Sequence, residues 1–144
     1  MDSVTTLYQT RVSAAGGRSG TVRSDDDALE LPYALPARLG GEGGGTNSDQ
    51  LFAAGYATCF SAAVIQVTDA QTIRVRDSDI EVIAQVDVSP DGRGSFGFSV
   101  TLEVKIAGLD QATANAVVAA AHKVCPYSNA IKGNIDVWFV VTVR

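Results

Sequence analysis

The sequence has few of the residues that would tie it to a nucleic acid, a membrane or a disulfide-rich scaffold. Its 144 residues include only two cysteines, one histidine, one methionine and one tryptophan. The 11 basic residues are scattered and outnumbered by 16 acidic ones, so there is no basic patch to attract nucleic acid or an anionic membrane. Two cysteines are too few for a stapled secreted domain. We therefore expect neither nucleic acid nor a membrane as a partner.

No targeting or membrane-spanning segment is recognisable. The first residues, MDSVTTLYQTRV, lack the basic start and apolar run of a secretory signal. Residues 51–67 carry no charge, but this run of seventeen is shorter than the roughly twenty residues that span a bilayer, and it contains polar residues. These absences predict a cytoplasmic protein whose uncharged segment is a helix buried inside protein.

The composition otherwise fits a single globular domain. Hydrophobic residues make up 46% of the chain and charged residues 19%, and no repeat or linker divides residues 1–144. Residues 7–13 and 20–24 are predicted strands joined by a glycine-containing turn, which places Arg18 at a bend. Residues 40–45 contain five glycines. This loop is more simply a flexible linker than a phosphate-binding loop, because no GK[ST] follows it.

A long helix is predicted after this loop. Thr46-Asn47-Ser48-Asp49 matches the [ST]-x-x-[DE] capping signal, so the helix should begin at about Asn47 or Ser48 and continue to about Ala70. Because the helix is apolar on every side, it must be surrounded by a sheet that wraps around it or by a second subunit.

The C-terminal half combines a hairpin, a second helix and a closing strand. Residues 79–88 and 95–106 alternate in hydrophobicity and flank SPDGRG, a hairpin signal. Asp110 can cap a helix that ends before a proline, so Cys125 should lie at an accessible helix end. The apolar stripe of this helix is predicted to contain Ala116, Val117, Ala120, Ala121 and Val124. With residues 135–144 as a closing strand, the pattern predicts an α+β fold.

Cys59 lies in the middle of the uncharged helix, and two interpretations of it remain open. A buried cysteine is usually a small, inert hydrophobe, which would make Cys59 part of the core. It is a useful nucleophile only as a thiolate, and apolar surroundings raise a thiol pKa, so a reactive Cys59 needs a cation from elsewhere. Arg18 is a candidate, although a turn arginine is more often solvated. Asp49 could orient Arg18 or serve only as the capping carboxylate.

Three stretches resemble the organic hydroperoxide resistance (Ohr) family of thiol peroxidases, within the wider Ohr/OsmC superfamily. They are LGGEGGGTN at residues 39–47, QLFAAGYATCF at residues 50–60 and AHKVCPYSNA at residues 121–130. The resemblance covers nearly the whole chain. It implies an α+β fold in which β-sheets wrap around the long central apolar helices of an intertwined homodimer.

The resemblance also implies roles for particular residues. Cys59 would be the peroxidatic cysteine, Cys125 the resolving cysteine and Arg18 the residue that activates the thiolate. In the family, a glutamate just before the Gln of the helix motif holds that arginine; here Asp49 occupies the position, and Ser48 stands where the family commonly has Pro. The implied reaction oxidises Cys59 to a sulfenic acid, which condenses with Cys125 to a disulfide that an external dithiol reopens.

The resemblance further implies a substrate class and a reductant, namely alkyl or fatty acid hydroperoxides and lipoylated proteins. Apolar residues near the motifs are candidates for the substrate site, with core filling as an equally good interpretation: Phe52, Tyr56, Phe60, Leu35 and Tyr127. Two other function classes stay open. One is an enzyme of the osmotically inducible (OsmC) branch, although CPYSNA and LFAAGY favour the Ohr branch, and the other is a catalytically weak redox sensor of the same fold.

Helix geometry adds an inference that is independent of the resemblance. If Asp49 and Cys59 lie on one continuous helix, ten residues at about 1.5 Å each put them roughly 15 Å apart. They cannot then share one site within a chain. We therefore expect Arg18 and Asp49 of one subunit to serve Cys59 of the other, across a homodimer in which the two apolar helices pack together.

The single histidine lies close to the second cysteine in sequence. His122 precedes Cys125 by three residues and is predicted to be structural or solvated, although this spacing would also let it touch Cys125. One histidine with two cysteines is a weak case for a metal site, so neither a metal nor a cofactor is expected.

Overall fold

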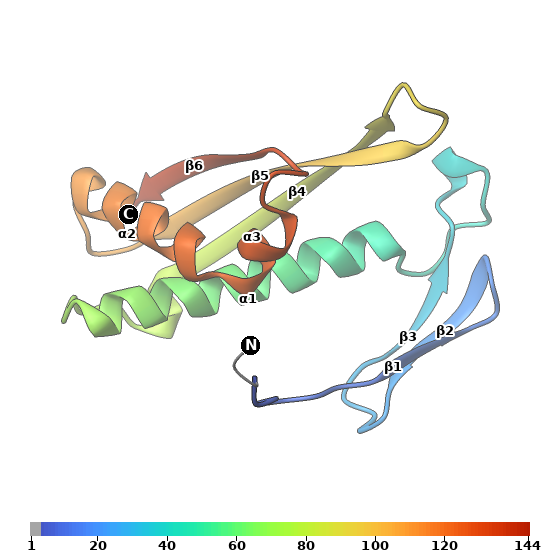
Figure 1. The fold of residues 1–144 in the computed structure, drawn as a ribbon, viewed down its shortest axis with the longest axis horizontal. Coiled ribbons are helices and arrows are strands. Elements are labelled where there is room, and N and C mark those ends of the chain that lie inside the picture. The colour runs from blue at the N-terminus through green and yellow to red at the C-terminus, as the bar shows by residue number, and fades with distance from the viewer. Residues whose placement is uncertain (1–3) are drawn as a thin grey trace. The chain divides into compact units, whose positions relative to one another are not determined.

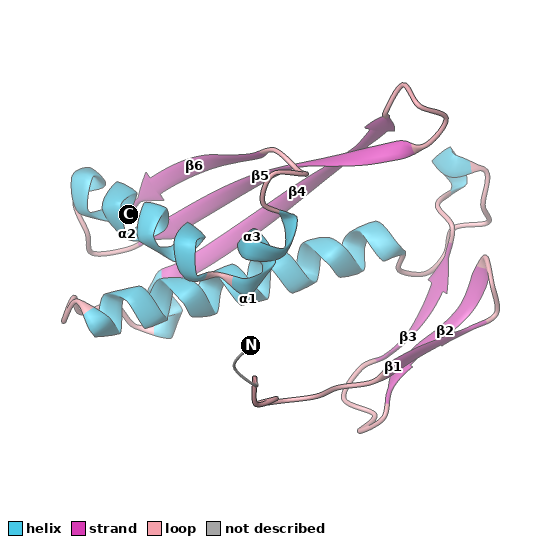
Figure 2. Cartoon of the chain, viewed as in Figure 1, coloured by secondary structure: helices cyan, strands magenta, loops and turns pink. Residues whose placement is uncertain are grey.

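The computed structural model describes residues 4–144, which form two compact units. The first unit ends at Leu51 and the second begins at Phe52, inside the long helix α1, Ser48–Ala70. Each unit contains one three-stranded sheet, and the helices belong mainly to the second (Figure 1, Figure 2). The fold class is therefore α+β, as the sequence predicted.

The sheet of the first unit is an antiparallel meander of β1 (Val12–Ala15), β2 (Ser19–Ser24) and β3 (Glu30–Ala34). A 3₁₀ turn, Ala37–Leu39, follows it. The predicted first strand, residues 7–13, starts too early. The reason is that the pairing of β1 with β2 ends where Val12 faces Ser24, the last residue of β2.

The turn between β1 and β2 requires glycine. Gly16 has a φ of 134° and Gly17 a φ of 75°, conformations that L side chains rarely adopt. A Cβ on Gly16 would also overlap the carbonyl group of Ser19. Arg18 therefore lies in a tight turn, as predicted, and its side chain is exposed.

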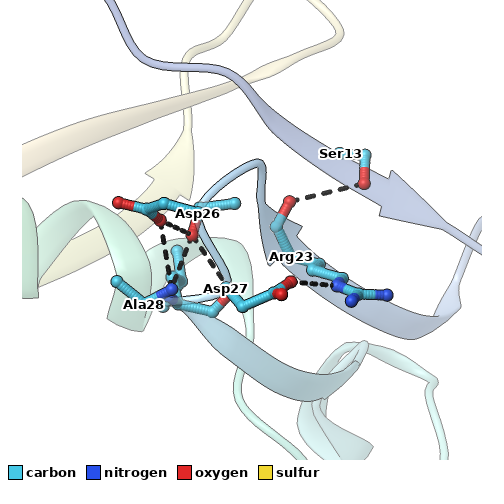
Figure 3. A network of polar contacts seen from close by, with 7 residues as sticks. Ser13, Arg23, Asp26, Asp27 and Ala28 are labelled. Carbon is cyan, nitrogen blue, oxygen red and sulfur yellow. Dashed lines mark hydrogen bonds and ion pairs between the residues drawn. The ribbon is translucent and has the colours of Figure 1, made fainter.

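Polar side chains close the turn between β2 and β3 (Figure 3). The Ser24 hydroxyl donates to Asp26 (Oγ to Oδ1, 2.7 Å), and the same carboxylate oxygen accepts the N–H of Ala28 (3.0 Å). These two bonds lower the pKa of Asp26, the Ser24 bond most. Arg23 forms an ion pair with Asp27. Hydrogen bonds and charge, more than apolar burial, hold this end of the first unit together.

Helix α1 spans the range that the sequence predicts, but a different residue caps it. The Asn47 side chain accepts the backbone N–H of Gln50 (2.9 Å), and the Thr46 hydroxyl donates to the Gln50 side chain (2.9 Å). The predicted pair of Thr46 and Asp49 is thus replaced by an Asn47 cap, because the Asn47 amide oxygen reaches the third helical N–H. This arrangement leaves the Asp49 carboxylate outside the hydrogen bonds of the cap.

The second unit packs helices against one face of a mixed sheet (Figure 1). After α1 and a 3₁₀ turn at Asp77–Asp79, its elements are β4 (Ile80–Pro90), β5 (Phe96–Ile106), α2 (Gln111–Val124), α3 (Pro126–Ile131) and β6 (Val137–Val143). β4 and β5 form the predicted antiparallel hairpin, and β6 pairs in parallel with β5. The short helix α3 is an element that the sequence did not predict.

The core of the second unit lies between this sheet and its helices. Val100, Leu102, Val104 and Ile106 of β5 alternate with outward residues and are fully buried, as the sequence pattern predicts. Burying each such side chain contributes about 1.5–3 kcal/mol. From α1 the core receives Tyr56, Phe60, Ala63, Val64, Val67 and Thr68.

The buried face of α2 differs from the predicted stripe. The helix buries Ala114, Val117, Val118 and Ala121, whereas Ala116 and Val124 are exposed and Ala120 is half-buried. Alanine and valine occur on several sides of this helix, so its sequence pattern alone does not select the side that the sheet covers.

By length and composition alone, α1 is apolar enough to cross a membrane. Six of its residues are nevertheless buried against the rest of the chain. α1 is therefore a core helix, as the sequence predicts.

Candidate active site

The two cysteines face each other in the second unit. Cys59 Sγ, midway along α1, lies 3.7 Å from Cys125 Sγ at the junction of α2 and α3. Both are free thiols; Cys59 is half-buried and Cys125 fully buried. A disulfide needs about 2.05 Å between the sulfurs, so a small local movement would join them. Across residues 4–144, no group of three or more His, Cys, Asp or Glu side chains is placed to hold a metal.

A corner in the chain turns Cys125 inward. α2 begins at an Asp110 cap, whose carboxylate accepts the N–H of Thr113 (2.7 Å), and it ends before Cys125 because Pro126 disfavours a helical residue in front of it. Pro126 then becomes the first residue of α3, where its missing N–H costs nothing. The prediction of an accessible thiol was wrong. Although it lies at a helix end, Cys125 faces the core and is 0% exposed.

Burial raises the pKa of the Cys59 thiol. Desolvation is the largest cause, the backbone N–H of Tyr127 opposes it by donating to the sulfur, and the neighbouring Cys125 raises the pKa further. None of these groups is a cation. With these contacts alone, Cys59 stays mostly a neutral thiol at pH 7, and a reactive thiolate requires an added positive charge.

A hydrogen-bonded chain of three side chains lies beside the thiols. The Tyr56 hydroxyl is 2.6 Å from Ser128 Oγ, which is 2.8 Å from His122 Nδ1. Tyr56 is 0% and Ser128 2% exposed. Desolvation raises the pKa of Tyr56 and lowers that of His122, so both are neutral at pH 7. His122 is thus a structural residue bonded to Ser128, which is one of the roles that the sequence left open.

Four of the predicted substrate residues form one aromatic cluster. The ring centroids of Phe52 and Tyr127 are 6.3 Å apart, those of Tyr56 and Tyr127 are 5.8 Å apart, and those of Tyr56 and Phe60 are 6.5 Å apart. Tyr56 and Phe60 are fully buried and form the back of the cluster, whereas Phe52 and Tyr127 keep exposed surface. Two further rings, which the motifs do not contain, extend it: Phe98 and Phe139.

Gly55 allows the start of α3 to lie close to α1. A Cβ at this position would overlap the hydroxyl group and ring of Tyr127. Tyr127 follows the corner that carries Cys125, so the close approach of its ring also brings Cys125 toward the thiol on α1. Gly55 thus permits the close packing of α1 and α3, which supports the contact between the sulfurs.

The remaining predicted site residues belong to the first unit. Arg18 is exposed in the β1–β2 turn, and its carbonyl accepts the N–H of Leu35 (2.9 Å). The Tyr33 hydroxyl donates to the neighbouring Gly17 carbonyl (2.9 Å), which holds the turn from the side of β3. Arg18 and Leu35 are therefore neighbours. Asp49 is half-buried in the first turn of α1.

Ser128, which the sequence analysis did not single out, connects the other residues of the site. Ser128 and His122 each lie three residues from Cys125, on opposite sides of it, and Tyr56 lies three residues before Cys59. Polar residues at this spacing around both thiols are the signal that the sequence contains. Their pairing depends on how α1 and α3 approach each other.

Comparisons with known proteins place the chain in a family. The family model described as OsmC-like protein matches residues 41–140. An organic hydroperoxide resistance protein of Xanthomonas axonopodis pv. citri is 42% identical over 132 residues, covering 91% of this chain and 92% of that protein. The organic hydroperoxide resistance protein OhrB of Bacillus subtilis is 45% identical over 133 residues, covering 91% of this chain and 95% of that one.

Solved structures agree with this grouping. The crystal structure of an organic hydroperoxide resistance protein OsmC from Legionella pneumophila superposes with a TM-score of 0.91 at 47% identity. The match covers 96% of this chain and all of the other. The similarity therefore extends over both units.

Proposed function

Since the chain belongs to the OsmC-like family and, within it, to the organic hydroperoxide resistance (Ohr) proteins, we propose that it is a Cys-based peroxidase that reduces organic hydroperoxides. The names of its relatives support a role in organic hydroperoxide resistance and oxidative stress defence. The observation that carries the peroxidase mechanism is the 3.7 Å between Cys59 Sγ and Cys125 Sγ. Two thiols at this distance can react in sequence: the peroxide oxidises one, and the other then forms a disulfide with it.

The proposed reaction uses the two thiols in turn. The Cys59 thiolate attacks the terminal oxygen of the hydroperoxide, the O–O bond breaks, and the alkoxide takes up a proton to leave as an alcohol. Cys59 is then a sulfenic acid. The Cys125 sulfur attacks the Cys59 sulfur, the S–O bond breaks, and a disulfide and water are formed.

An external dithiol completes the cycle. One of its thiolates attacks the disulfide and the second displaces the enzyme thiol, so the dithiol becomes a disulfide and both enzyme thiols are restored. Cys59 is half-buried and Cys125 fully buried, which favours attack at Cys59 with Cys125 as the leaving group. We propose a lipoyl group carried by a protein as this dithiol, as membership of the Ohr family implies.

We further propose a homodimer in which Arg18 and Asp49 of one subunit complete the site around Cys59 of the other. Asp49 and Cys59 are ten residues apart on the continuous helix α1, about 15 Å along its axis. An Arg18 guanidinium beside the sulfur would offset the desolvation that raises the thiol pKa. The Asp49 carboxylate lies outside the helix cap and is available to hold the guanidinium.

The substrate's apolar part is proposed to contact the aromatic cluster. Phe52 and Tyr127 offer exposed apolar surface, with the buried rings of Tyr56 and Phe60 behind them. Leu35, whose backbone bonds to Arg18, is proposed to contact the substrate from the partner subunit. We also propose that both units work as one domain, because the relatives match the chain across both. We propose the cytoplasm as the compartment in which the protein acts.

Multiple-turnover assays test this proposal. The consumption of cumene hydroperoxide, tert-butyl hydroperoxide and hydrogen peroxide would be followed with dihydrolipoamide as reductant. The wild type is expected to prefer the two organic peroxides. Cys59→Ser should abolish turnover, whereas Cys125→Ser should react once and accumulate a sulfenic acid.

Two other results would identify a different function. A single slow oxidation of Cys59 without turnover would contradict the peroxidase and indicate a redox sensor, for which Asp49 in place of the family's glutamate is the distinguishing residue. Comparable rates with hydrogen peroxide and the organic peroxides would instead indicate the OsmC branch. In either case Asp49→Glu is the next variant to measure.

A further inference from the structure

Two contacts join α1 to the corner between α2 and α3. On each side, the two residues that make these contacts are three positions apart in the sequence. Cys59 contacts Cys125, with 3.7 Å between the sulfurs. Three residues before Cys59 and three residues after Cys125, Tyr56 contacts Ser128, with 2.6 Å between the oxygens. The hydroxyl contact therefore holds together the same two segments that the thiols must join.

The hydroxyl contact is the more deeply buried of the two. Tyr56 and Ser128 are almost completely buried, so their hydroxyl groups have each other, and not water, as partners. His122 on α2 supplies the third member, with its Nδ1 2.8 Å from Ser128 Oγ and its ring edge against Phe139 of β6 (centroids 4.9 Å apart). Three elements thus meet at one buried serine, next to the thiol pair.

We infer that Tyr56, Ser128 and His122 are positioning residues for the resolving thiol: they hold Cys125 against Cys59 and thereby speed disulfide formation. This inference rests on the proposed peroxidase, because it concerns the second step of that reaction. The first step, oxidation of Cys59 by the hydroperoxide, does not involve Cys125 and should not depend on Ser128, which lies outside the aromatic cluster. Holding two reacting groups in contact raises their effective concentration, and one hydrogen bond is enough to change it severalfold.

The protonation state of His122 decides whether the chain of bonds is complete. With neutral His122, Tyr56 O–H can donate to Ser128 and Ser128 O–H can donate to Nδ1, so each gap holds one proton. Protonated His122 would place a third proton into the two gaps, and one hydroxyl would lose its acceptor. The chain should therefore be intact above the pKa of His122 and disrupted below it.

The surroundings of His122 agree with a neutral ring at pH 7. Desolvation lowers its pKa below the ordinary 6.5, and the positive charge of Lys132, which follows α3, lowers it further. The ring contacts the uncharged Phe139 on β6 and Ser128 on α3, and through Ser128 it is linked to Tyr56 on α1. Lys123, the next residue on α2, is exposed.

Single-turnover kinetics separate the two steps. Reduced protein would be mixed with one equivalent of cumene hydroperoxide, with peroxide loss and disulfide formation followed separately by acid quenching and mass spectrometry. Ser128 lies outside the aromatic cluster, so Ser128→Ala is expected to oxidise Cys59 within about twofold of the wild-type rate. Tyr56→Phe is expected to form the disulfide about three to ten times more slowly than the wild type, the factor of one lost hydrogen bond. Ser128→Ala, which loses both bonds, should be slower still and accumulate more sulfinic acid with excess peroxide.

Thr68→Val is the matched control. Thr68 is also buried on α1 and donates one hydroxyl hydrogen bond, to the Ile65 carbonyl (3.0 Å), nine residues beyond Cys59. It should lower stability without slowing disulfide formation. Disulfide formation at the wild-type rate in both Tyr56→Phe and Ser128→Ala would overturn the inference. Equal slowing of disulfide formation by Thr68→Val would also overturn the inference, since a general loss of stability would then explain the slower rates.

His122→Asn tests the histidine's part. The asparagine oxygen can take the place of Nδ1 as an acceptor but does not titrate near neutral pH. The disulfide-forming rates of wild type and His122→Asn should agree within about twofold above pH 7. The wild-type rate divided by the His122→Asn rate should fall below one as wild-type His122 becomes protonated, at a pH below 6.5. A ratio that does not change between pH 5 and 8 would remove His122 from the positioning group.

A peroxide-free measurement distinguishes failure of this inference from failure of the proposed function. The equilibrium between the thiol pair and its disulfide would be measured in glutathione redox buffers. Tyr56→Phe should disfavour the disulfide by about three- to tenfold, whether or not the wild type reduces hydroperoxides. No peroxide turnover with this shift present would refute the peroxidase alone, whereas turnover without the shift would refute the positioning role alone.

Discussion

The two units of this chain each contain a three-stranded sheet, but only one of these sheets has a core of its own. Val22 and Ala34 are the buried apolar residues between positions 4 and 51, while Val12 and Leu31 are 50% and 40% exposed. The sheet of the second unit instead covers a continuous core shared with three helices. Small sheets without an apolar face against another element are marginally stable in water. The first unit is therefore expected to obtain apolar cover from outside itself.

The chemistry is divided in the same way. The second unit contains both thiols and the hydrogen bonds that hold them together, but the groups around Cys59 raise its pKa. The first unit contains Arg18, presented in a glycine turn. A sheet that lacks a core and contains the cation that we propose for Cys59 would satisfy both needs by packing against a second copy of the chain. The predictions below test this division.

Removal of the cation should have the largest effect. Arg18→Ala is expected to reduce kcat/KM for cumene hydroperoxide by about a hundredfold or more, comparable to the loss of one electrostatic stabiliser in an active site. The pH midpoint for alkylation of Cys59 by iodoacetamide should rise, because no cation then offsets the effect of burial on the thiol pKa. Arg93→Ala is the matched control, since Arg93 also lies in a glycine turn, but in the second unit. It should leave both measurements unchanged.

Chain mixing shows whether the cation comes from the partner. Equal amounts of Arg18→Ala and Cys59→Ser chains, unfolded and refolded together, should regain activity, because a heterodimer contains one intact site. Activity in the mixture equal to that of the separate variants, with heterodimers confirmed by native mass spectrometry, would contradict the intersubunit site.

Substitution of one leucine in each sheet tests whether only the second unit has a core of its own. Leu102→Ala in the second unit should lower the free energy of unfolding by about 3 kcal/mol, as expected for a fully buried leucine. Leu31→Ala in the first unit should cost less, about 1 kcal/mol, but should make the urea midpoint depend more strongly on protein concentration. If Leu31→Ala were neutral at every concentration, the first sheet would not be covered by a partner.

Gly55→Ala should disturb the contact between α1 and α3. In an unconstrained helix this change would stabilise, but here the new Cβ overlaps Tyr127, so a net loss of about 1–3 kcal/mol is expected. The melting temperature and the rate of disulfide formation should both fall. Gly97→Ala on β5 is the control, because a Cβ there meets only the Asp91 Cβ, at 3.9 Å.

The smallest effects should come from two hydrogen-bonded carboxylates, Asp26 in the β2–β3 turn of the first unit and Asp110 at the start of α2 in the second. Hydrogen bonds lower the pKa of Asp26 and of Asp110 below 3.8, so the stability they contribute is present above that pH and is lost as the pH falls through the folded value. Asp26→Asn and Asp110→Asn keep an acceptor and should behave like the wild type at pH 7 but decline less below pH 4. Hydrogen exchange should show each change mainly in its own unit, and a global response to Asp26→Asn would mean that the units unfold together.

Much of the fold was predictable because its signals are local. The range of α1, the hairpin of β4 and β5, the Asp110 cap and the stop at Pro126 depend on residues within a few positions of each other. The buried side of α2 was not predictable, since alanines on several sides of a helix do not show which side faces a sheet. Thr46 and Asn47 are adjacent, and either side chain can cap a helix. The local sequence did not show which of them caps α1, because the geometry of the side chains decides it.

The sequence by itself determined most of the secondary structure, the family and the two thiols as candidates, because periodicity, capping residues and contiguous motifs are properties of neighbouring residues. Only the tertiary structure decided that Cys125 is buried, that it lies 3.7 Å from Cys59, and that Tyr56 and His122 meet at Ser128. These contacts join residues that are as far apart as 72 positions in the chain. Their distances depend on how α1 packs against the corner between α2 and α3, which no local pattern encodes.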